Sequence, residues 1–401
     1  MTACDTVSDS RDLARPIGLA LSGGGFRAML FHLGAIVRLN EMRLLRELDE
    51  VSGVSGGAIV AGRLAAVWPR LRFRVGMAVN LWEELAAPLL EFAGRRVDIR
   101  AAARALVPGV SAARQLEAAY RNSVVGMTTL GDMPARPRFS FLAVHLASGA
   151  PWVFERRGAE SVSIGRLRDP SIPLVRAMAA SSAYPPFLAP LVLHMDPARL
   201  DHPTRIEPRA VLADGGMYDN LGLHGLWDRC ATILCSDAGG VLQPMARTSG
   251  FWLRQLARAM EIHTDRSRSL RRHVALEELR LGRKAGTLWR TDANLSSYPV
   301  EPAFSVDPSW PPHLAEMRTR LDRFSIVEQC RLINWGYLVS DVALRSHVVH
   351  RHPPAKLPFP PLSFVLPAPS PNRLIDRSEA DSRFAQPRSS RRARIGARSG
   401  S

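Results

Sequence analysis

Two glycine clusters near the N-terminus constrain the fold of this chain more than any other feature. The first, Ser-Gly-Gly-Gly at residues 22–25, follows a short apolar run at residues 17–21. The second, Gly-Val-Ser-Gly-Gly at residues 53–57, follows another short run and precedes apolar sequence with helical spacing. Both clusters therefore lie at predicted strand-to-helix turns, where a parallel α/β sheet carries its functional groups.

The second cluster contains a Gly-x-Ser-x-Gly motif centred on Ser55. A serine on a sharp strand-to-helix turn has a strained backbone and an exposed hydroxyl group. Gly53 and Gly57 leave room for the backbones that pack around such a turn. The motif alone is common by chance, but its position after a predicted strand makes Ser55 a candidate nucleophile.

The first cluster supplies three consecutive backbone N–H groups, those of Gly23, Gly24 and Gly25. Backed by a helix N-terminus, such donors suit an oxyanion. The spacing Gly23-x-Gly25-x-x-Ala28 also fits a relaxed dinucleotide-binding loop. That interpretation is weaker, because the next predicted strand ends in the serine turn and not in an acid that would hold a ribose.

Length and composition indicate one large domain with extensions. The chain has 401 residues, of which 46% are hydrophobic, enough for a substantial core. No apolar stretch is long enough to span a bilayer, and the first sixteen residues contain no apolar signal core. We therefore expect a cytoplasmic protein, with peripheral membrane contact left open. The four cysteines have neither zinc-ligand spacing nor a disulfide framework, so we expect no metal site and no cofactor.

The chain is strongly basic, with a net charge of +16, and its only lysines are Lys284 and Lys356. An arginine-rich surface suits anionic partners, either phospholipid head groups or nucleic acid. We expect lipid and not nucleic acid, and the oligomeric state stays open. One basic stretch, residues 247–282, has two interpretations. We favour a packed helix with a solvated arginine face; the alternative is a membrane-surface helix with Trp252, Leu256 and Met260 on one face.

A serine nucleophile needs a base, and histidine is the usual one. His224 and His263 follow a candidate acid in the chain order of many hydrolases, but neither lies in a recognisable loop after a strand. His32 falls within the first predicted helix, where a packed role is more common. The histidines considered are His32, His194, His202, His224 and His263.

A carboxylate acting directly is the alternative base. Asp214 ends a predicted strand and is followed by two glycines, which allow a sharp turn. If the sheet is parallel, its strand ends share one edge, and burial there would raise the pKa of Asp214 enough for it to accept the Ser55 proton. Asp237 also ends a strand and precedes small residues, but we favour Asp214 because Gly215 and Gly216 follow it immediately.

Taken in order, the motifs at residues 23–27, 53–57 and 214–216 resemble those of the patatin-like phospholipase family. The phrases at residues 179–187 and 214–223 resemble its bacterial branch. The resemblance covers roughly residues 17–226 and implies a three-layer α/β/α fold with a mostly parallel central sheet. It further implies hydrolysis of lipid acyl esters, of phospholipase A or lysophospholipase type, by a Ser-Asp dyad without a catalytic histidine. The alternatives are a Ser-His-Asp carboxylesterase and an inactive basic protein that binds lipid or nucleic acid.

The resemblance assigns a role to each matching residue. Ser55 becomes the nucleophile and Asp214 the proton acceptor. Arg27 either orients the loop, forms a structural salt bridge or meets a lipid phosphate. One departure is Ala28, where the family usually has glycine. The resemblance places the oxyanion loop at Gly23, Gly24, Gly25, Phe26 and Arg27, the nucleophile turn at Gly53 and Gly57, and the Asp-Gly-Gly motif at Asp214, Gly215 and Gly216.

The resemblance also suggests how the chain is divided. We expect a disordered lead over residues 1–16 and the patatin-like catalytic domain over residues 17–226. Residues 227–350 would extend the same domain with further strands and helices. Residues 351–371 are proline-rich and linker-like, and residues 372–401 contain eight arginines against three acids, so we expect the segment 351–401 to be a linker and a disordered tail.

Overall fold

The computed structural model describes residues 13–97, 112–185, 188, 190–201, 209–245, 250–307, 310–349 and 352–359. The predictions made for residues 1–12 and 360–401, which include most of the expected lead and tail, lie outside the described residues. His202 and Cys4 lie outside them as well.

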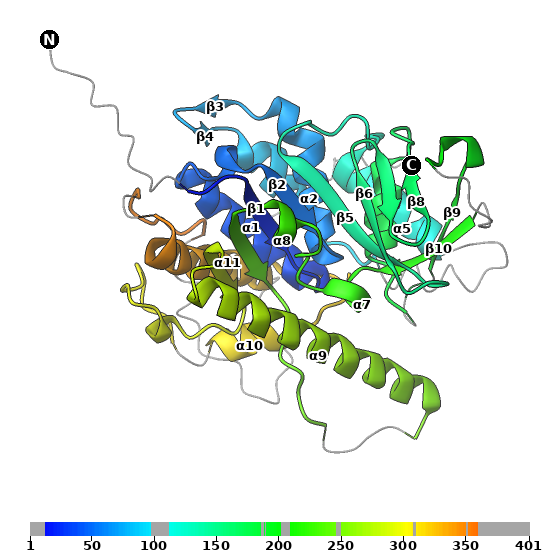
Figure 1. Cartoon of the computed structure of the whole chain (residues 1–401). Coiled ribbons are helices and arrows are strands. Elements are labelled where there is room, and N and C mark those ends of the chain that lie inside the picture. Colours follow the sequence, from blue (N-terminus) through cyan, green and yellow to red (C-terminus); the bar gives the residue numbers. More distant parts are fainter. Residues whose placement is uncertain are drawn as a thin grey trace, which may run out of the picture.

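A ten-stranded sheet runs through the described part of the chain, and helices cover both of its faces (Figure 1). The main path is β12-β11-β1-β2-β5-β6-β7-β8, and β10 branches from β5 to pair with β9. The strands from β12 to β5 are parallel, and those beyond β5 are antiparallel to their neighbours. The predicted three-layer α/β/α fold with a parallel central sheet is thereby confirmed. The strands are β1 (Ile17–Leu21), β2 (Glu50–Gly53), β5 (Arg138–His145), β6 (Pro151–Glu155), β7 (Gly158–Ser161), β8 (Gly165–Leu167), β9 (Leu191–His194), β10 (Arg209–Asp214), β11 (Thr232–Asp237) and β12 (Ala285–Arg290), with a separate hairpin of β3 (Phe73–Arg74) and β4 (Met77–Ala78).

The helices differ greatly in length. The helices are α1 (Gly25–Glu41), α2 (Gly56–Val67), α3 (Ala87–Ala93), α5 (Ala112–Tyr120), α6 (Leu174–Ser181), α7 (Gly216–Asp219), α8 (Leu226–Arg229), α9 (Trp252–Arg280), α10 (Trp310–Glu316) and α11 (Ile326–His347). Short 3₁₀ turns occur at Leu45–Glu47, Trp68–Arg70, Pro197–Arg199 and Leu295–Ser297, and π-helical turns at Trp82–Ala86 and Arg121–Val125.

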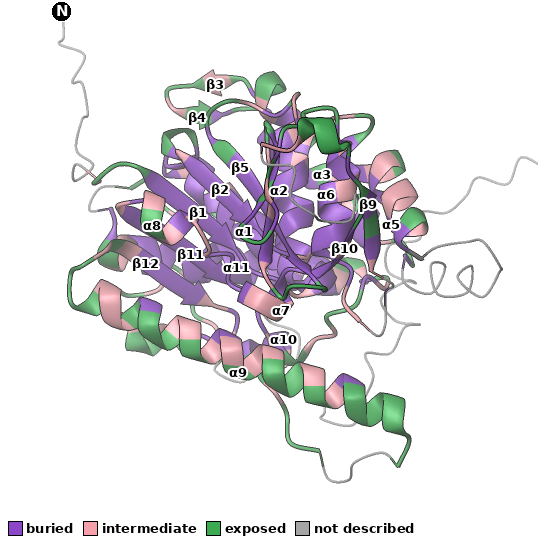
Figure 2. Ribbon diagram, turned by 45° about the vertical axis from the view of Figure 1, so that its right-hand side comes forward, coloured by how far each residue is buried: buried purple, intermediate pink, exposed green. Residues whose placement is uncertain are grey.

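The two faces of the sheet are covered to different depths. Alternate residues of β1 point to opposite faces: Leu19 and Leu21 join the large core under α1, α2 and α11, while Ala20 joins a smaller core with α8 and part of α9. Helices α1 and α11 approach so closely that a β-carbon on Gly34 would lie 2.0 Å from the carbonyl oxygen of Ile333. Figure 2 shows the result, with buried strands and α1 at the centre and an exposed α9 at the margin.

Strands β1 and β2 place the two glycine clusters side by side. The strands are parallel, with Leu21 opposite Gly53. Each strand ends there and the chain turns into a helix, α1 after β1 and α2 after β2. The turns therefore meet at the same edge of the sheet, as the sequence predicts.

Asp214 reaches this edge by a different route from the one we expected. We placed it at the carboxyl end of a parallel strand, but β10 is antiparallel to β5. Strand β5 pairs with β2 at Phe141 and Gly53 and then continues to His145. Strand β10 returns along this overhang until Asp214 lies opposite Ala143, just beyond the level of Gly53. The strand direction was wrong in our reasoning, although the chain does bring the carboxylate to the serine.

The basic stretch forms the single long helix α9, and six of its seven arginines are at least partly exposed. The packed side contains Ala257, Ala275 and the side chain of Arg268, all buried. Trp252 and Leu256, expected to lie on an apolar face, are exposed to solvent. The favoured packed helix with a solvated arginine face is thus only partly correct, because one arginine is buried and several apolar side chains are not.

Candidate active site

Ser55 has a strained backbone at the turn between β2 and α2. Its φ of 51° and ψ of −115° lie outside the regions that an ordinary L-residue favours. The Ser55 N–H donates a hydrogen bond to the hydroxyl oxygen of Ser181, at the end of α6, over 3.0 Å. This bond fixes the turn, and the Ser55 side chain lines the cavity described below.

The backbones of the two glycine turns pack so closely that a side chain larger than that of glycine would not fit at these positions. A β-carbon on Gly56 would lie 2.2 Å from the carbonyl oxygen of Gly25. A β-carbon on Gly57 would lie 2.2 Å from the carbonyl oxygen of Leu21. Gly24 and Gly25 also have positive φ values of 143° and 58°, which a side chain would strain. Only glycine permits this backbone approach.

The amides of the glycine loop face the site without another acceptor. Gly23 donates its N–H to the carbonyl oxygen of Asn220 over 3.0 Å. Within the part of the chain that the structure describes, no hydrogen bond is found for the N–H groups of Gly24 and Gly25. They begin α1, where the helix has no internal acceptor for them. These two amides are able to bind an oxyanion.

Asp214 lies beside Ser55, whose hydroxyl group acts to lower the pKa of its carboxyl group. Asp214 is only 2% exposed, and it accepts a hydrogen bond from the N–H of Gly216 over 2.7 Å. Burial raises the pKa of Asp214 to about 7, although the bonds from Gly216 and Ser55 oppose the rise. The carboxyl group is therefore poised to gain and lose a proton near neutral pH.

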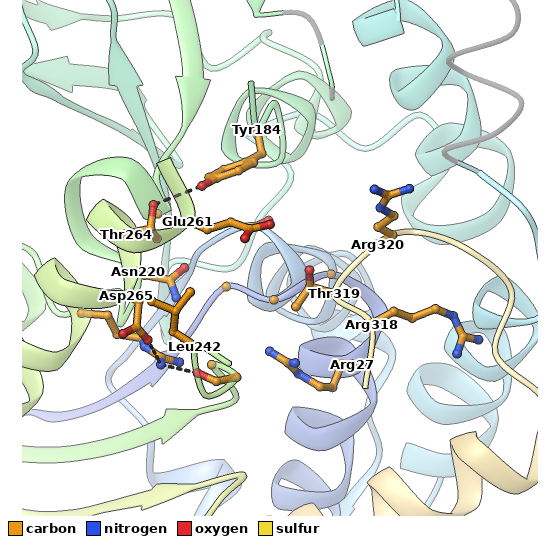
Figure 3. Close-up of a pocket in the computed structure, with 18 of the residues that line it drawn as sticks. Arg27, Tyr184, Asn220, Leu242, Glu261, Thr264, Asp265, Arg318, Thr319 and Arg320 are labelled. Carbon is orange, nitrogen blue, oxygen red and sulfur yellow. Dashed lines mark hydrogen bonds and ion pairs between the residues drawn. The ribbon is translucent and has the colours of Figure 1, made fainter. Parts of the chain in front are cut away.

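A cavity of about 420 Å³ opens onto Ser55 and Asp214. One wall consists of Glu261, Thr264 and Asp265 from α9, and Figure 3 shows these opposite the segment that carries Thr319. Tyr184 closes one side, where its hydroxyl group lies 3.2 Å from that of Thr264. The cavity is lined by more apolar than polar surface, which suits an amphipathic ligand.

Arg27 orients the glycine loop. Its guanidinium group donates hydrogen bonds to the carbonyl oxygens of Ala238, Ala315 and Met317 over 2.7 to 3.3 Å. Burial, with Arg268 nearby, lowers the pKa of Arg27 to about 10, so it stays cationic at neutral pH. The side chain ties α1 to the segment whose Thr319 carbonyl covers Gly25. Orientation of the loop by Arg27 stays a prediction, which these contacts support.

None of the histidines that the structure describes lines the cavity with Ser55. His224 packs edge-on against Tyr218 with ring centroids 5.3 Å apart, and His263 is exposed on α9. His194 lies on β9, beside a different cavity. These positions leave Asp214, and not a histidine, as the buried titratable group beside Ser55.

His32 links two of the segments that carry the site. It is fully buried, and burial lowers its pKa to about 4, so the ring is neutral. Its Nε2 lies 2.9 Å from the Ser22 carbonyl oxygen, to which it must donate, and its Nδ1 then accepts from the Ser236 hydroxyl at 2.7 Å. The ring thus joins the base of the glycine loop to the end of β11.

Asp237 also ends a strand, β11, but it faces cations. Its carboxylate lies 3.5 Å from Arg268 and 3.3 Å from Arg272, both on α9. Burial alone would raise the pKa of Asp237, but the two guanidinium groups and the N–H of Gly239 lower it. Asp237 therefore stays ionised at neutral pH, and its ion pairs with Arg268 and Arg272 anchor α9.

Sequence reasoning missed three residues of the site. Ser181 accepts from the serine turn, and the side-chain oxygen of Asn220 lies between the glycine loop and Gly216. Thr264 comes from a helix far along the chain. Ser181 and Asn220 lie in the segments 179–187 and 214–223, which carry the family resemblance. That resemblance was the only sign in the sequence that these two residues belong to the site. Among the described residues no cluster of three metal-ligating side chains occurs.

Two kinds of comparison with known proteins gave matches. Solved structures that are similar to this chain include human GIVD cytosolic phospholipase A2, at 12% identity and a TM-score of 0.45, covering 81% of this chain and 61% of that one. VipD from Legionella pneumophila is similar at 16% identity and a TM-score of 0.37, covering 84% and 68%. This chain thus spans less than two thirds of the human enzyme. A search among curated proteins found no match.

A model of the family described as patatin-like phospholipase matches residues 19–227, which is more than half of the chain. The match contains both glycine clusters and the Asp-Gly-Gly motif. The resemblance to a bacterial branch remains a prediction. The chain belongs to the patatin-like phospholipase family.

Proposed function

We propose that this protein is a lipid acyl hydrolase that uses Ser55 as nucleophile and Asp214 as general base. The observation that carries the proposal is that Ser55 and the buried carboxyl group of Asp214 line the same cavity, where the Ser55 hydroxyl group influences the pKa of Asp214. The raised pKa of Asp214 and the strained backbone of Ser55 support the same roles.

The reaction follows from the positions of the groups. Ser55 Oγ attacks the carbonyl carbon of an ester, and its proton passes to the Asp214 carboxylate. The amides of Gly24 and Gly25 hold the tetrahedral oxyanion. The intermediate collapses and expels the alcohol, which takes the proton from Asp214. Water then attacks the acyl-enzyme while Asp214 accepts its proton, and the fatty acid leaves as Ser55 regains its hydrogen.

Family membership and the lining of the cavity support a lipid ester as substrate. The proposed class is the carboxylic ester hydrolases of phospholipase A or lysophospholipase type. A cavity with more apolar than polar surface accepts an acyl chain, and polar residues such as Glu261 and Thr264 line its wall.

The test is the variant Ser55→Ala, assayed with a diacyl phospholipid in vesicles and with a short-chain reporter ester. We expect kcat to fall by about 10⁴ or more, because no other group forms the acyl-enzyme. The matched control is Ser148→Ala, an exposed serine in the turn between β5 and β6, which should retain full activity. Unchanged hydrolysis by Ser55→Ala would refute the proposal.

A Ser-His-Asp esterase on the same fold is the rival that we disfavour. His224 and His263 lie away from the cavity lining, so replacing either should leave kcat unchanged. Loss of turnover in His224→Ala, with full turnover in Asp214→Asn, would favour the triad instead. A catalytically inactive binding protein would give no labelling of Ser55 by a fluorophosphonate.

A further inference from the structure

The outward side of α9 carries apolar side chains that nothing in the described chain covers. Leu270 is 67% exposed, Trp252 63%, Val274 52% and Leu256 45%. The packed side of the same helix is formed by Ala257, which is small and buried, together with Ala275 and Arg268. The usual amphipathic arrangement is therefore inverted, and Figure 2 shows α9 as largely exposed.

Of the seven large apolar side chains exposed on α9, four form one stripe, while Leu253, Ile262 and Leu276 project in other directions. Trp252 and Leu256 are one turn apart, as are Leu270 and Val274, and whole turns of helix separate the two pairs. The four side chains therefore project from the same side of α9, one pair near its N-terminal end and one pair in its C-terminal half. A stripe of this kind marks a docking surface.

The polar residues on this side identify the partner. His263, Arg266 and His273 interrupt the stripe, and all three are exposed. A second copy of the chain packed on the stripe would bring the arginines of two such helices together. An anionic lipid surface would instead pair with them while accepting the apolar side chains.

The helix as a whole has a basic excess. Seven arginines stand against four acidic residues between Trp252 and Arg280. Three of those acids pair with arginines of the same helix: Glu261 with Arg258, Asp265 with Arg268 and Glu277 with Arg280. The net charge of the full chain, +16, has the same sign. Charge complementarity therefore favours an anionic surface.

The opposite side of α9 forms a wall of the cavity. Glu261, Thr264 and Asp265 line it, as Figure 3 shows. We propose that the outward side of α9 is the surface by which this protein docks on an anionic phospholipid bilayer. The inference deepens the proposed function and rests on it for the choice of a lipid partner. Docking through α9 brings a wall of the cavity to the bilayer that holds the substrate.

The experiment measures binding of the full chain to vesicles by co-sedimentation. All variants contain Ser55→Ala, so that hydrolysis does not alter the vesicles. The stripe variant is Trp252→Ser with Leu270→Ser. The matched control is Met127→Ser with Val162→Ser, two apolar residues that are 79% and 89% exposed elsewhere on the surface. Vesicles are phosphatidylcholine alone and an equal mixture of phosphatidylcholine and phosphatidylglycerol.

We expect the stripe variant to bind the mixed vesicles at least about tenfold more weakly than the parent, because two large apolar side chains no longer enter the interface. The control should bind within about twofold of the parent. Binding of the parent to phosphatidylcholine alone should be much weaker, since the basic residues then lack anionic partners.

Three results would overturn the inference. One is equal binding of the stripe variant and the control to the mixed vesicles. Another is parent binding that does not depend on phosphatidylglycerol. The third is a dimeric parent that becomes monomeric in the stripe variant with vesicle binding unchanged, which would assign the stripe to a second copy. Failure of the proposed chemistry is separate, because it appears as absent hydrolysis of the reporter ester by the chain with Ser55 intact.

Discussion

Two aspartates at strand ends, Asp214 on β10 and Asp237 on β11, have almost the same burial and opposite chemistry. Each is at most 2% exposed, and each accepts a hydrogen bond from an N–H two residues later, that of Gly216 or Gly239. Burial raises the pKa of Asp214 to about 7, whereas the pKa of Asp237 is lowered. The difference lies in what faces each carboxylate.

Asp237 faces Arg268 and Arg272 from α9, while no cation is among the groups that shift the pKa of Asp214. A buried carboxylate with cationic partners stays ionised and becomes part of the framework. A buried carboxylate next to a serine hydroxyl is costly to ionise and is able to exchange a proton near neutral pH. The comparison teaches that a position at a strand end does not by itself make an aspartate a base. The neighbouring charges decide whether its carboxyl group stays ionised or exchanges a proton near neutral pH.

The largest effect that sharpens this comparison is the loss of activity in Asp214→Asn. An amide cannot accept the Ser55 proton, so we expect kcat on the reporter ester to fall by about 10³ to 10⁴. Asp237→Asn, compared per folded molecule, should keep kcat within about tenfold. Equal losses of kcat in the two variants would contradict the assignment of Asp214 as the base and of Asp237 as a structural anion.

The second effect is on stability, and there Asp237 should dominate. Asp237→Asn leaves the buried guanidinium group of Arg268 without this partner, and we expect the free energy of unfolding to fall by about 3 kcal/mol. Denaturant unfolding followed by circular dichroism measures it. Asp214→Asn, measured at pH 8 in the same way, should show no such loss. A fully stable Asp237→Asn protein would contradict the framework role.

The third effect is a difference in pH dependence. The native state keeps the Asp214 proton up to about pH 7, but the unfolded chain releases it near pH 4. The native state therefore binds more protons in this window, and this carboxyl group makes the wild type less stable as pH rises from 4 to 7. As pH rises from 5 to 8, the free energy of unfolding of Asp214→Asn should therefore increase by about 2–3 kcal/mol relative to that of the wild type.

Asp237 gives the control for that measurement. Its lowered pKa keeps it ionised in both states above about pH 5, so its contribution is lost only as pH falls through the native pKa, below that window. The stability difference between Asp237→Asn and the wild type should thus be the same at pH 5 and pH 8. A pH-independent difference for Asp214→Asn would mean that its pKa is not raised.

The smallest expected effect concerns Ser181, which accepts the N–H of Ser55. Ser181→Ala removes that acceptor, loosens the strained turn and should lower kcat by about tenfold. Ser340→Ala is the matched control, because Ser340 is equally buried and donates to the Tyr337 carbonyl oxygen in α11, away from the cavity. If both variants keep full kcat, Ser181 does not position the nucleophile.

Much of this arrangement was predictable from local sequence, and some of it was not. The two glycine turns could be placed because each strand-to-helix change is encoded within a few residues. The direction of β10 could not, since it depends on β5 continuing past Gly53 and on antiparallel pairing with that overhang. Reasoning that placed Asp214 on a parallel strand therefore reached it by an incorrect route.

Contacts between segments far apart in the sequence also explain why other features were not predicted. The partners of Asp237 lie on α9, and the charge pattern of α9 gave no sign that Arg268 would be buried or that Trp252 would be exposed. No local spacing links Ser181 to the turn of Ser55. Such contacts are set by tertiary packing, which periodicity within one segment does not encode.

The most direct test of the central claim is the rate at which a fluorophosphonate labels Ser55 as a function of pH. Mass spectrometry of the peptide containing Ser55 measures the rate in the wild type, Asp214→Asn and Asp237→Asn. We predict that the rate rises with pH around a midpoint near 7 in the wild type and in Asp237→Asn, because the free carboxylate of Asp214 activates the serine. In Asp214→Asn the rise should vanish and labelling should be slow at every pH. Labelling of Asp214→Asn at the wild-type rate and with the same midpoint would contradict the account.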